Sequence, residues 1–94
     1  MTKGTNVTVN SVLPGPTRSE AIVDYLKTRI SNPNASQEEI EKEYFRKERP
    51  TSLIQRMAEN SEVASLVAYL ASPLASNTNG AALRCEGGIL RALF

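Results

Sequence analysis

The first clear pattern along the chain is a β-type run that ends in a stiff turn. The run alternates apolar and polar positions, as a largely buried strand does. Its members are Val7, Val9, Val12 and Leu13, with Thr8, Asn10 and Ser11 between them. Pro14-Gly15-Pro16 follows at once. Proline fixes φ and withholds a donor, whereas glycine permits close approach of a ligand or a backbone. The turn is therefore either a ligand-facing position at a strand's carboxyl end or an ordinary strand exit.

A first helix is predicted after this turn. Ser19 suits its N-cap, and the residues behind it repeat at the i, i+4, i+8 spacing of an apolar helix face. That face comprises Ile22, Val23, Leu26 and Ile30. Asn32-Pro33-Asn34 ends the helix, because this sequence favours a turn.

A second, highly charged helix follows. Ser36 and Glu39 match a capping box, and the helix runs towards Lys47 and stops before Pro50. Its apolar side is small and consists of Ile40, Tyr44 and Phe45. We therefore expect this helix to lie on the surface.

The last third of the chain predicts a loop, a strong helix and a second strand. Residues 49–57 suit a loop with a short helical turn at Leu53-Ile54. Asn60 or Ser61 can cap the next helix, and Glu62 favours its positive end. Its apolar face has i, i+3, i+4, i+7 spacing and comprises Val63, Leu66, Val67 and Leu70. Pro73 ends this helix, and residues 81–85 form a strand before Gly87-Gly88.

Two strands separated by helices predict an α/β protein with a parallel crossover. Parallel sheets need both faces covered, and two strands alone make no stable sheet. The pattern therefore predicts an incomplete Rossmann-like fragment with two strands and three to four helices. Either the chain pairs its edges with another copy, or it is part of something larger.

The composition of the chain excludes several classes of function. The 94 residues allow one domain, and 11 basic against 10 acidic residues give a net charge of +1. The charges are scattered, so no basic face predicts nucleic-acid binding. No apolar run approaches the roughly 20 residues that span a bilayer, and no signal-like segment opens the chain. These features predict a soluble, cytoplasmic protein.

Cysteine and histidine usage excludes further chemistry. Cys85 is the only cysteine and there is no histidine, so no disulfide forms within one chain. We expect Cys85 to be a core residue. Zinc sites and triads that depend on a histidine base are excluded within this chain. The sequence therefore predicts no metal site.

Two separated segments resemble the C-terminal part of the short-chain dehydrogenase/reductase family. The segment from Asn10 to Ser19 is similar to the family's Asn-x-x-x-Pro-Gly-x-x-x-Thr/Ser motif at the end of its sixth strand. The segment from Ser61 to Gly88 is similar to the family's helix, loop and last strand. That strand usually ends in Val-Asp-Gly-Gly, where this chain has Cys85 and Glu86 in place of valine and aspartate. The resemblance covers the chain from near its first residue to its last.

The resemblance implies roles for the residues around the turn. In the family, the Pro-Gly backbone and the hydroxyl residue after it contact the nicotinamide end of NAD or NADP. These roles fall to Pro14, Gly15 and Ser19, with Thr17 a nearby candidate. Ser19 is equally well explained as an N-cap, and the two roles are compatible. Residues 20–57 correspond to the family's variable substrate lid.

The sequence departs from the family in its catalytic parts. We find no glycine-rich phosphate loop. A catalytic Tyr-x-x-x-Lys pair is also missing, because the residues four positions after Tyr25, Tyr44 and Tyr69 are arginine, glutamate and proline. We assign no catalytic residue. Residues 1–94 are thus interpreted as one C-terminal fragment of a nicotinamide-dependent oxidoreductase, inactive alone and binding no cofactor by itself. The alternatives are a homo-oligomeric self-association module, a pseudoenzyme, or one half of an enzyme completed by an upstream N-terminal part.

Overall fold

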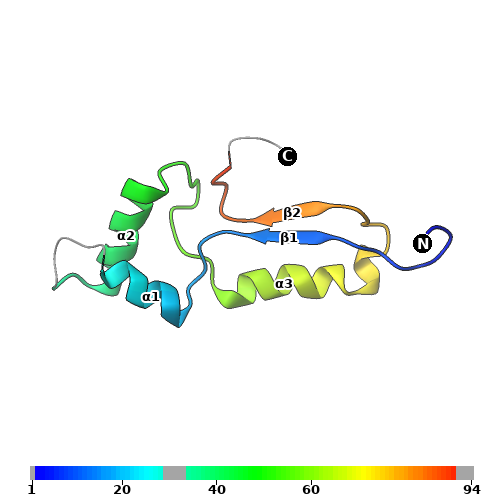
Figure 1. Cartoon of the computed structure of the whole chain (residues 1–94), viewed down its shortest axis with the longest axis horizontal. Helices are drawn as coiled ribbons and strands as arrows, with labels where there is room; N and C mark the ends of the chain where they lie inside the picture. Colours follow the sequence, from blue (N-terminus) through cyan, green and yellow to red (C-terminus); the bar gives the residue numbers. More distant parts are fainter. Residues whose placement is uncertain (1, 29–33, 91–94) are drawn as a thin grey trace.

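The chain folds around a two-stranded parallel sheet. The computed structural model describes residues 2–28 and 34–90. Strands β1 (Ser11–Pro14) and β2 (Ala82–Cys85) pair in parallel, with Ser11 opposite Ala82 and Pro14 opposite Cys85 (Figure 1). The predicted parallel α/β architecture is confirmed. β1 is shorter than the predicted run because β2 offers it only four partners.

Side-chain amides continue the pairing beyond β1. The Asn10 side chain donates to Thr78 O at 3.0 Å and accepts from Ala81 N at 3.0 Å. One residue earlier, Val9 N donates to Asn79 Oδ1 at 2.9 Å. Asn10 therefore aligns the chain entering β1 with the loop entering β2, which sets the register of the sheet.

In the described part of the chain, three α-helices connect the strands. They are α1 (Glu20–Lys27), α2 (Gln37–Glu48) and α3 (Asn60–Leu70), followed by a 3₁₀ turn η1 (Pro73–Ala75). The caps predicted at Ser19 and Ser36 are confirmed, since each hydroxyl accepts the backbone N–H three residues on, at 3.3 and 3.2 Å. Ile30, Asn32 and Pro33, which complete the predicted first helix and its end, lie outside the described residues.

The buried core lies between α1, α2 and the loop before α3, away from the sheet (Figure 1). As expected, α2 lies on the surface, and of its residues only the small apolar side is buried. That side meets Leu26 of α1 and Met57 of the loop, and all the core members are buried: Leu26, Ile40, Tyr44, Phe45 and Met57. Tyr44 and Phe45 also contact edge to face, with ring centroids 5.2 Å apart. The lid-like region 20–57 therefore has its own core.

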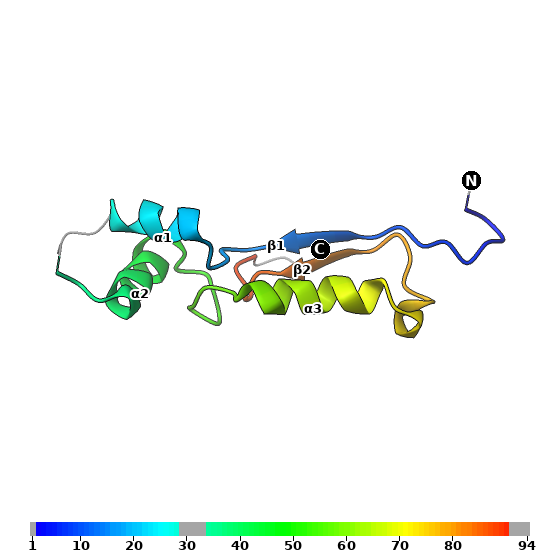
Figure 2. The same cartoon turned by 90° about the horizontal axis from the view of Figure 1, so that it is seen from below.

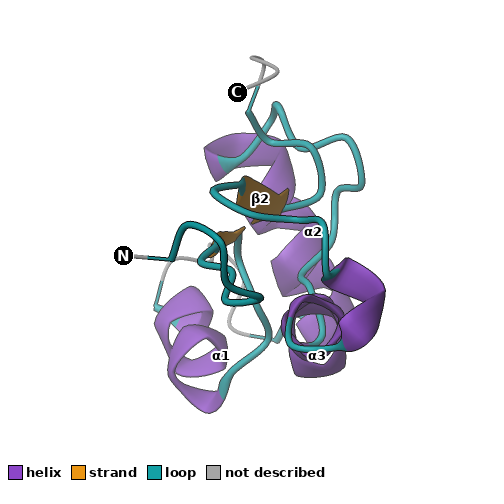
Figure 3. Cartoon of the chain, turned by 90° about the vertical axis from the view of Figure 1, so that its right-hand side faces the viewer, coloured by secondary structure: helices purple, strands orange, loops and turns teal. Residues whose placement is uncertain are grey.

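The sheet is much less covered. Only one side of the two strands carries α3 (Figures 2 and 3), and no residue of α3 is buried. The expectation of a largely buried first strand is wrong for this chain, because Val7, Val9 and Leu13 are 56%, 63% and 46% exposed. Cys85 is likewise half-buried and not a core residue. A parallel strand needs cover on both faces, and within residues 2–28 and 34–90 only one face carries a helix.

Residues 49–57 differ from the prediction. They form a loop without a helical turn, because Gln55 adopts a left-handed φ of 54°. The N-cap of α3 is Glu59 and neither Asn60 nor Ser61. The Glu59 N–H donates to the Glu62 carboxylate at 2.9 Å, so the capping partner comes from the third helical residue.

The overall shape is elongated. Its principal extents are 58 × 26 × 20 Å and its radius of gyration is 16.8 Å, against about 12 Å for a compact domain of this length. The lid core, which denotes the buried cluster of the lid-like region, lies at one end of the long axis, beyond the carboxyl ends of the strands (Figure 1). This is a partial fold. Among the described residues, no helix has the length and apolar character needed to cross a membrane.

Candidate functional site

The turn that leaves β1 lies directly against the end of β2. Gly15 N donates to Cys85 O at 3.1 Å. A Cβ added at Gly15 would lie 2.8 Å from both Cα and Cβ of Glu86, a distance that real Cβ contacts do not reach. Position 15 therefore requires glycine for close approach, not for an unusual φ.

The opposite side of the turn is bonded to the segment before α3. Ala58 N donates to Pro16 O at 2.9 Å, and Arg18 N donates to Ala58 O at 2.8 Å. These two bonds form an isolated parallel bridge between Thr17 and Ala58. The backbone from Gly15 to Arg18 is thus fixed from both sides, which orients the groups that it presents.

The two hydroxyl residues of the turn point to different partners. Thr17 Oγ1 donates to Gly15 O at 2.9 Å, so this hydroxyl closes the turn on itself. Ser19 Oγ accepts from Ile22 N at 3.3 Å and caps α1. A hydroxyl that accepts in this way still has its own hydrogen to donate. Ser19 can therefore cap a helix and donate to a ligand at once.

Pro14 and Gly15 border a pocket of about 400 Å³ between the strand ends and the lid core. Its polar side chains come from the lid-like region, at Tyr44 and Arg49, and from the end of β2, at Arg84 and Glu86. Ser19 lines a different pocket, of about 450 Å³, together with Arg18 and Asp24. Two of the four predicted cofactor residues, Pro14 and Gly15, therefore border one pocket, whereas Ser19 lines another and Thr17 lines neither of the two.

The Gly87-Gly88 pair anchors the loop between α2 and α3. Both glycines have positive φ, 69° and 81°, and a Cβ at Gly87 would lie 2.3 Å from Ile54 Cγ2. Leu53 N and Ile54 N both donate to Gly87 O at 3.0 Å. Only glycine allows this approach, so the pair holds the lid-like region against the end of β2.

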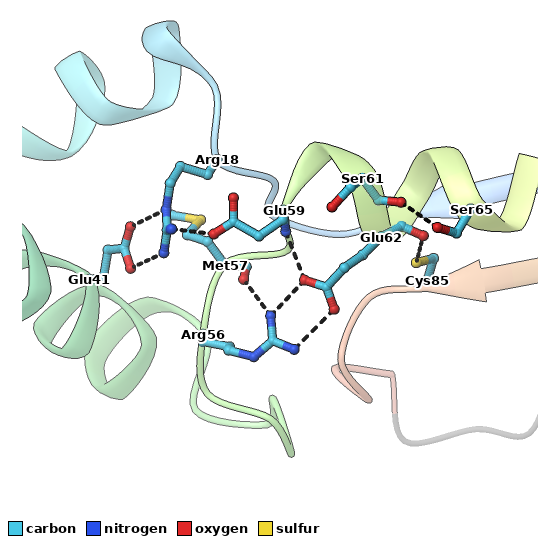
Figure 4. Close-up of polar contacts among 9 residues, drawn as sticks. All are labelled: Arg18, Glu41, Arg56, Met57, Glu59, Ser61, Glu62, Ser65 and Cys85. Carbon is cyan, nitrogen blue, oxygen red and sulfur yellow. Dashed lines mark hydrogen bonds and ion pairs between the residues drawn. The ribbon is translucent and has the colours of Figure 1, made fainter.

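Figure 4 shows a network of ion pairs that connects the turn, through Arg18, to α2 and to the start of α3. Arg18 binds Glu41 of α2 through Nε and Nη2, both at 3.0 Å, and also pairs with Glu59. The hydrogen bond to Glu41 raises the pKa of Arg18. In the sequence the charged residues are scattered, as they are on solvated helix faces. The ion pairs of this network were therefore not predicted. An arginine directly between two predicted site residues is the signal that could have revealed it.

A second pair continues the network to α3. Arg56 donates to both carboxylate oxygens of Glu62, at 2.7 and 3.0 Å. This hydrogen bond, followed by the one from Glu59 N, lowers the pKa of Glu62 from 4.5 to about 2. Cys85 Sγ lies 3.9 Å from Glu62 O. Within residues 2–28 and 34–90 no group of acidic or cysteine side chains is arranged to hold a metal ion.

Comparison with known proteins places the chain in a family. A family model described as enoyl-(acyl carrier protein) reductase matches residues 2–90. The chain is 52% identical over 93 residues to YvrD, an uncharacterised oxidoreductase of Bacillus subtilis (strain 168), and this match covers 99% of the chain.

Two solved structures share the fold. A short-chain dehydrogenase family protein from Francisella tularensis superposes with a TM-score of 0.70 at 25% identity, covering 89% of this chain and 33% of that one. A variant of actinorhodin polyketide ketoreductase solved with NADPH superposes with a TM-score of 0.70 at 29% identity, covering 95% and 33%.

The chain spans about a quarter to a third of the length of the curated relatives that it matches, and 35% of YvrD. Its partial sheet and its lid-like region agree with this coverage. The family match extends over nearly all of the described residues. The chain therefore belongs to the short-chain dehydrogenase/reductase family, as a fragment of its Rossmann-like fold.

Proposed function

We propose that this chain supplies the nicotinamide-facing edge and the substrate lid of an NAD- or NADP-dependent oxidoreductase. The observation that carries this proposal is the Pro14-Gly15 turn. It is bonded on one side to the end of β2 and on the other to Ala58, and it borders a pocket of about 400 Å³. The related ketoreductase structure contains NADPH.

The residues at the turn fit the chemistry of a nicotinamide. Its carboxamide offers both donors and an acceptor, and a turn supplies carbonyls and hydroxyls to meet them. Pro14 and Gly15 would present backbone groups to the ring, and Ser19 would donate its hydroxyl. Thr17 is the weaker candidate, because its hydroxyl already donates to Gly15 O.

We further propose that the chain alone neither binds the dinucleotide strongly nor turns it over. The glycine-rich loop and the Tyr-x-x-x-Lys pair are not found in its sequence, and in the family the loop seats the pyrophosphate. A complementing N-terminal part would have to supply both.

Titration calorimetry of the isolated chain with NADH and NADPH tests this proposal, and we expect no one-site isotherm with either dinucleotide. A clear isotherm would overturn the claim that most of the binding energy lies outside this chain. A control injection into buffer gives the heat of dilution.

Self-association is a second candidate role, favoured by the exposed apolar residues. Val67, Tyr69 and Leu74 of the α3 to η1 region are 50%, 43% and 83% exposed. Together with the open face of β1, they leave apolar surface that a second copy could bury. We expect a homodimer or larger assembly in sedimentation equilibrium at tens of micromolar. A well-folded monomer at that concentration would exclude this role.

A further inference from the structure

Arg18 joins three segments of the chain that are distant in sequence. Its backbone N–H donates to Ala58 O at 2.8 Å. Its guanidinium forms a two-pronged hydrogen bond with Glu41 on α2, at 3.0 Å for each contact. The remaining nitrogen, Nη1, pairs with Glu59, the N-cap of α3 (Figure 4). One side chain thus contacts the lid-like region and the start of α3 while its backbone belongs to the turn.

The Arg18–Glu41 pair is better sheltered than an ordinary surface ion pair. The Glu41 side chain is only 12% exposed, although that of Arg18 is 41% exposed. Two parallel N–H···O bonds fix the orientation of both groups, which a single ammonium cannot do. The pair therefore specifies geometry more than it adds stability.

The location of this pair determines what it can position. Arg18 lies directly between Thr17 and Ser19, and Ser19 caps α1. Holding Arg18 against Glu41 therefore fixes where α1 begins relative to α2. It also positions the backbone that carries Ser19, whose hydroxyl accepts from Ile22 N.

We propose that Arg18 is a positioning residue that couples the lid-like region to the nicotinamide edge. The inference rests on the proposed function, because it assumes that Ser19 and the turn face the nicotinamide. Arg18 itself touches no ligand in this account. It acts by holding α2 against the turn.

Hydrogen exchange on the full 94-residue chain tests the coupling. In Arg18→Gln we expect the amides of α1 and α2 to exchange about fivefold faster, while those of β2 and the later turns of α3 stay unchanged. Glu41→Gln should give the same pattern, and the double variant should add little more, because both changes remove one interaction. Lys47→Gln is the matched control, since it removes a 2.7 Å ion pair to Glu43 within α2 itself.

Uniform acceleration over all elements would overturn the proposal, because it would mean that Arg18 supports only global stability. No change in α1 and α2 would overturn it as well. Arg18→Lys keeps the positive charge but loses the two-pronged hydrogen bond. We therefore expect the amides of α1 and α2 to exchange more slowly than in Arg18→Gln but faster than in the unchanged protein.

A binding measurement separates this inference from the proposed function. In a chimera where this chain replaces the matching 93-residue segment of YvrD, Arg18→Gln should weaken binding of the preferred dinucleotide about fivefold. Binding of the same molecule lacking its nicotinamide should not change. If Arg18→Gln weakened the binding of both molecules equally, or weakened the binding of neither, the role of Arg18 would be overturned. A chimera with no dinucleotide affinity at all would instead refute the proposed function.

Discussion

Gly15 and Glu86 are in direct backbone contact at the carboxyl ends of the two strands. A Cβ at position 15 would lie 2.8 Å from the Glu86 Cα, and Gly15 N donates to the neighbouring Cys85 O at 3.1 Å. The contact brings the turn of one strand onto the exit of the other. It is the structural reason why the Pro14-Gly15-Pro16 turn and the Glu86-Gly87-Gly88 segment form one edge.

Substitution of Gly15 should disrupt this contact and destabilise the fold. Gly15→Ala forces a methyl group into the Glu86 backbone, and overpacking of this kind costs about 1–3 kcal/mol. Urea unfolding measures the loss. Ser11→Ala on the same strand is the control, because Ser11 is exposed and its replacement should change stability by less than about 0.5 kcal/mol. Equal stability of the two variants would mean that the contact relaxes without cost.

Gln55 is the one described residue other than glycine with a positive φ, at 54°. Its side chain donates to Ser52 O at 2.7 Å and to Arg49 O at 3.2 Å. Gln55→Ala loses these bonds and keeps the unfavourable φ, whereas Gln55→Gly loses them and relieves it. We expect the glycine variant to be more stable than the alanine variant by about 1 kcal/mol in urea unfolding. Identical midpoints would show that this φ carries no strain.

Phe45 should be critical to the lid core. It is 1% exposed and packs beside Leu26 and Met57. Phe45→Ala should destabilise the core by about 3–5 kcal/mol, as large-to-small core changes do. Loss of the near-ultraviolet circular dichroism signal of Tyr44, which remains in this variant, would report it. Leu53→Ala is the control, because Leu53 is 86% exposed. A native-like spectrum in Phe45→Ala would contradict the placement of the core.

The cap of α3 should weaken in acid. The hydrogen bond from Arg56 lowers the pKa of Glu62 from 4.5 to about 2. A lowered carboxyl pKa stabilises the folded state above the ordinary value, and this stabilisation is lost as the pH falls from about 4.5 to about 2. Helicity followed by circular dichroism should fall over this range. Glu62→Gln should remove that component of the titration, and Arg56→Gln should move it to higher pH. An acid profile unchanged in both variants would contradict the assignment.

Local rules predicted the features that depend on neighbouring residues. The caps at Ser19 and Ser36 follow from residues three positions apart, and the parallel sheet follows from the order of the elements. Glu59 was missed as a cap because glutamate is not a preferred N-cap residue. Its role depends on the Glu62 carboxylate, which accepts its N–H.

Features that depend on tertiary contacts were not predictable from the sequence pattern. The burial of Ile40, Tyr44 and Phe45 on α2 depends on contacts with Leu26 and Met57. The exposure of Val9 depends on the sheet, which among the described residues carries a helix on only one face. At the candidate site, the turn was recognised from its residues. Its bonds to Ala58 and the ion pairs of Arg18 depend on segments about 20 to 40 residues away.

Calorimetric titration of the YvrD chimera with NADH and NADPH tests the central claim most directly. In that protein, the residues of this chain replace their counterparts in a relative 52% identical to it. We expect a one-site isotherm with one of the dinucleotides, weakened by Gly15→Ala and by Ser19→Ala. A folded chimera that binds neither dinucleotide, or that binds equally well after both substitutions, would contradict the assignment of this turn as the nicotinamide edge.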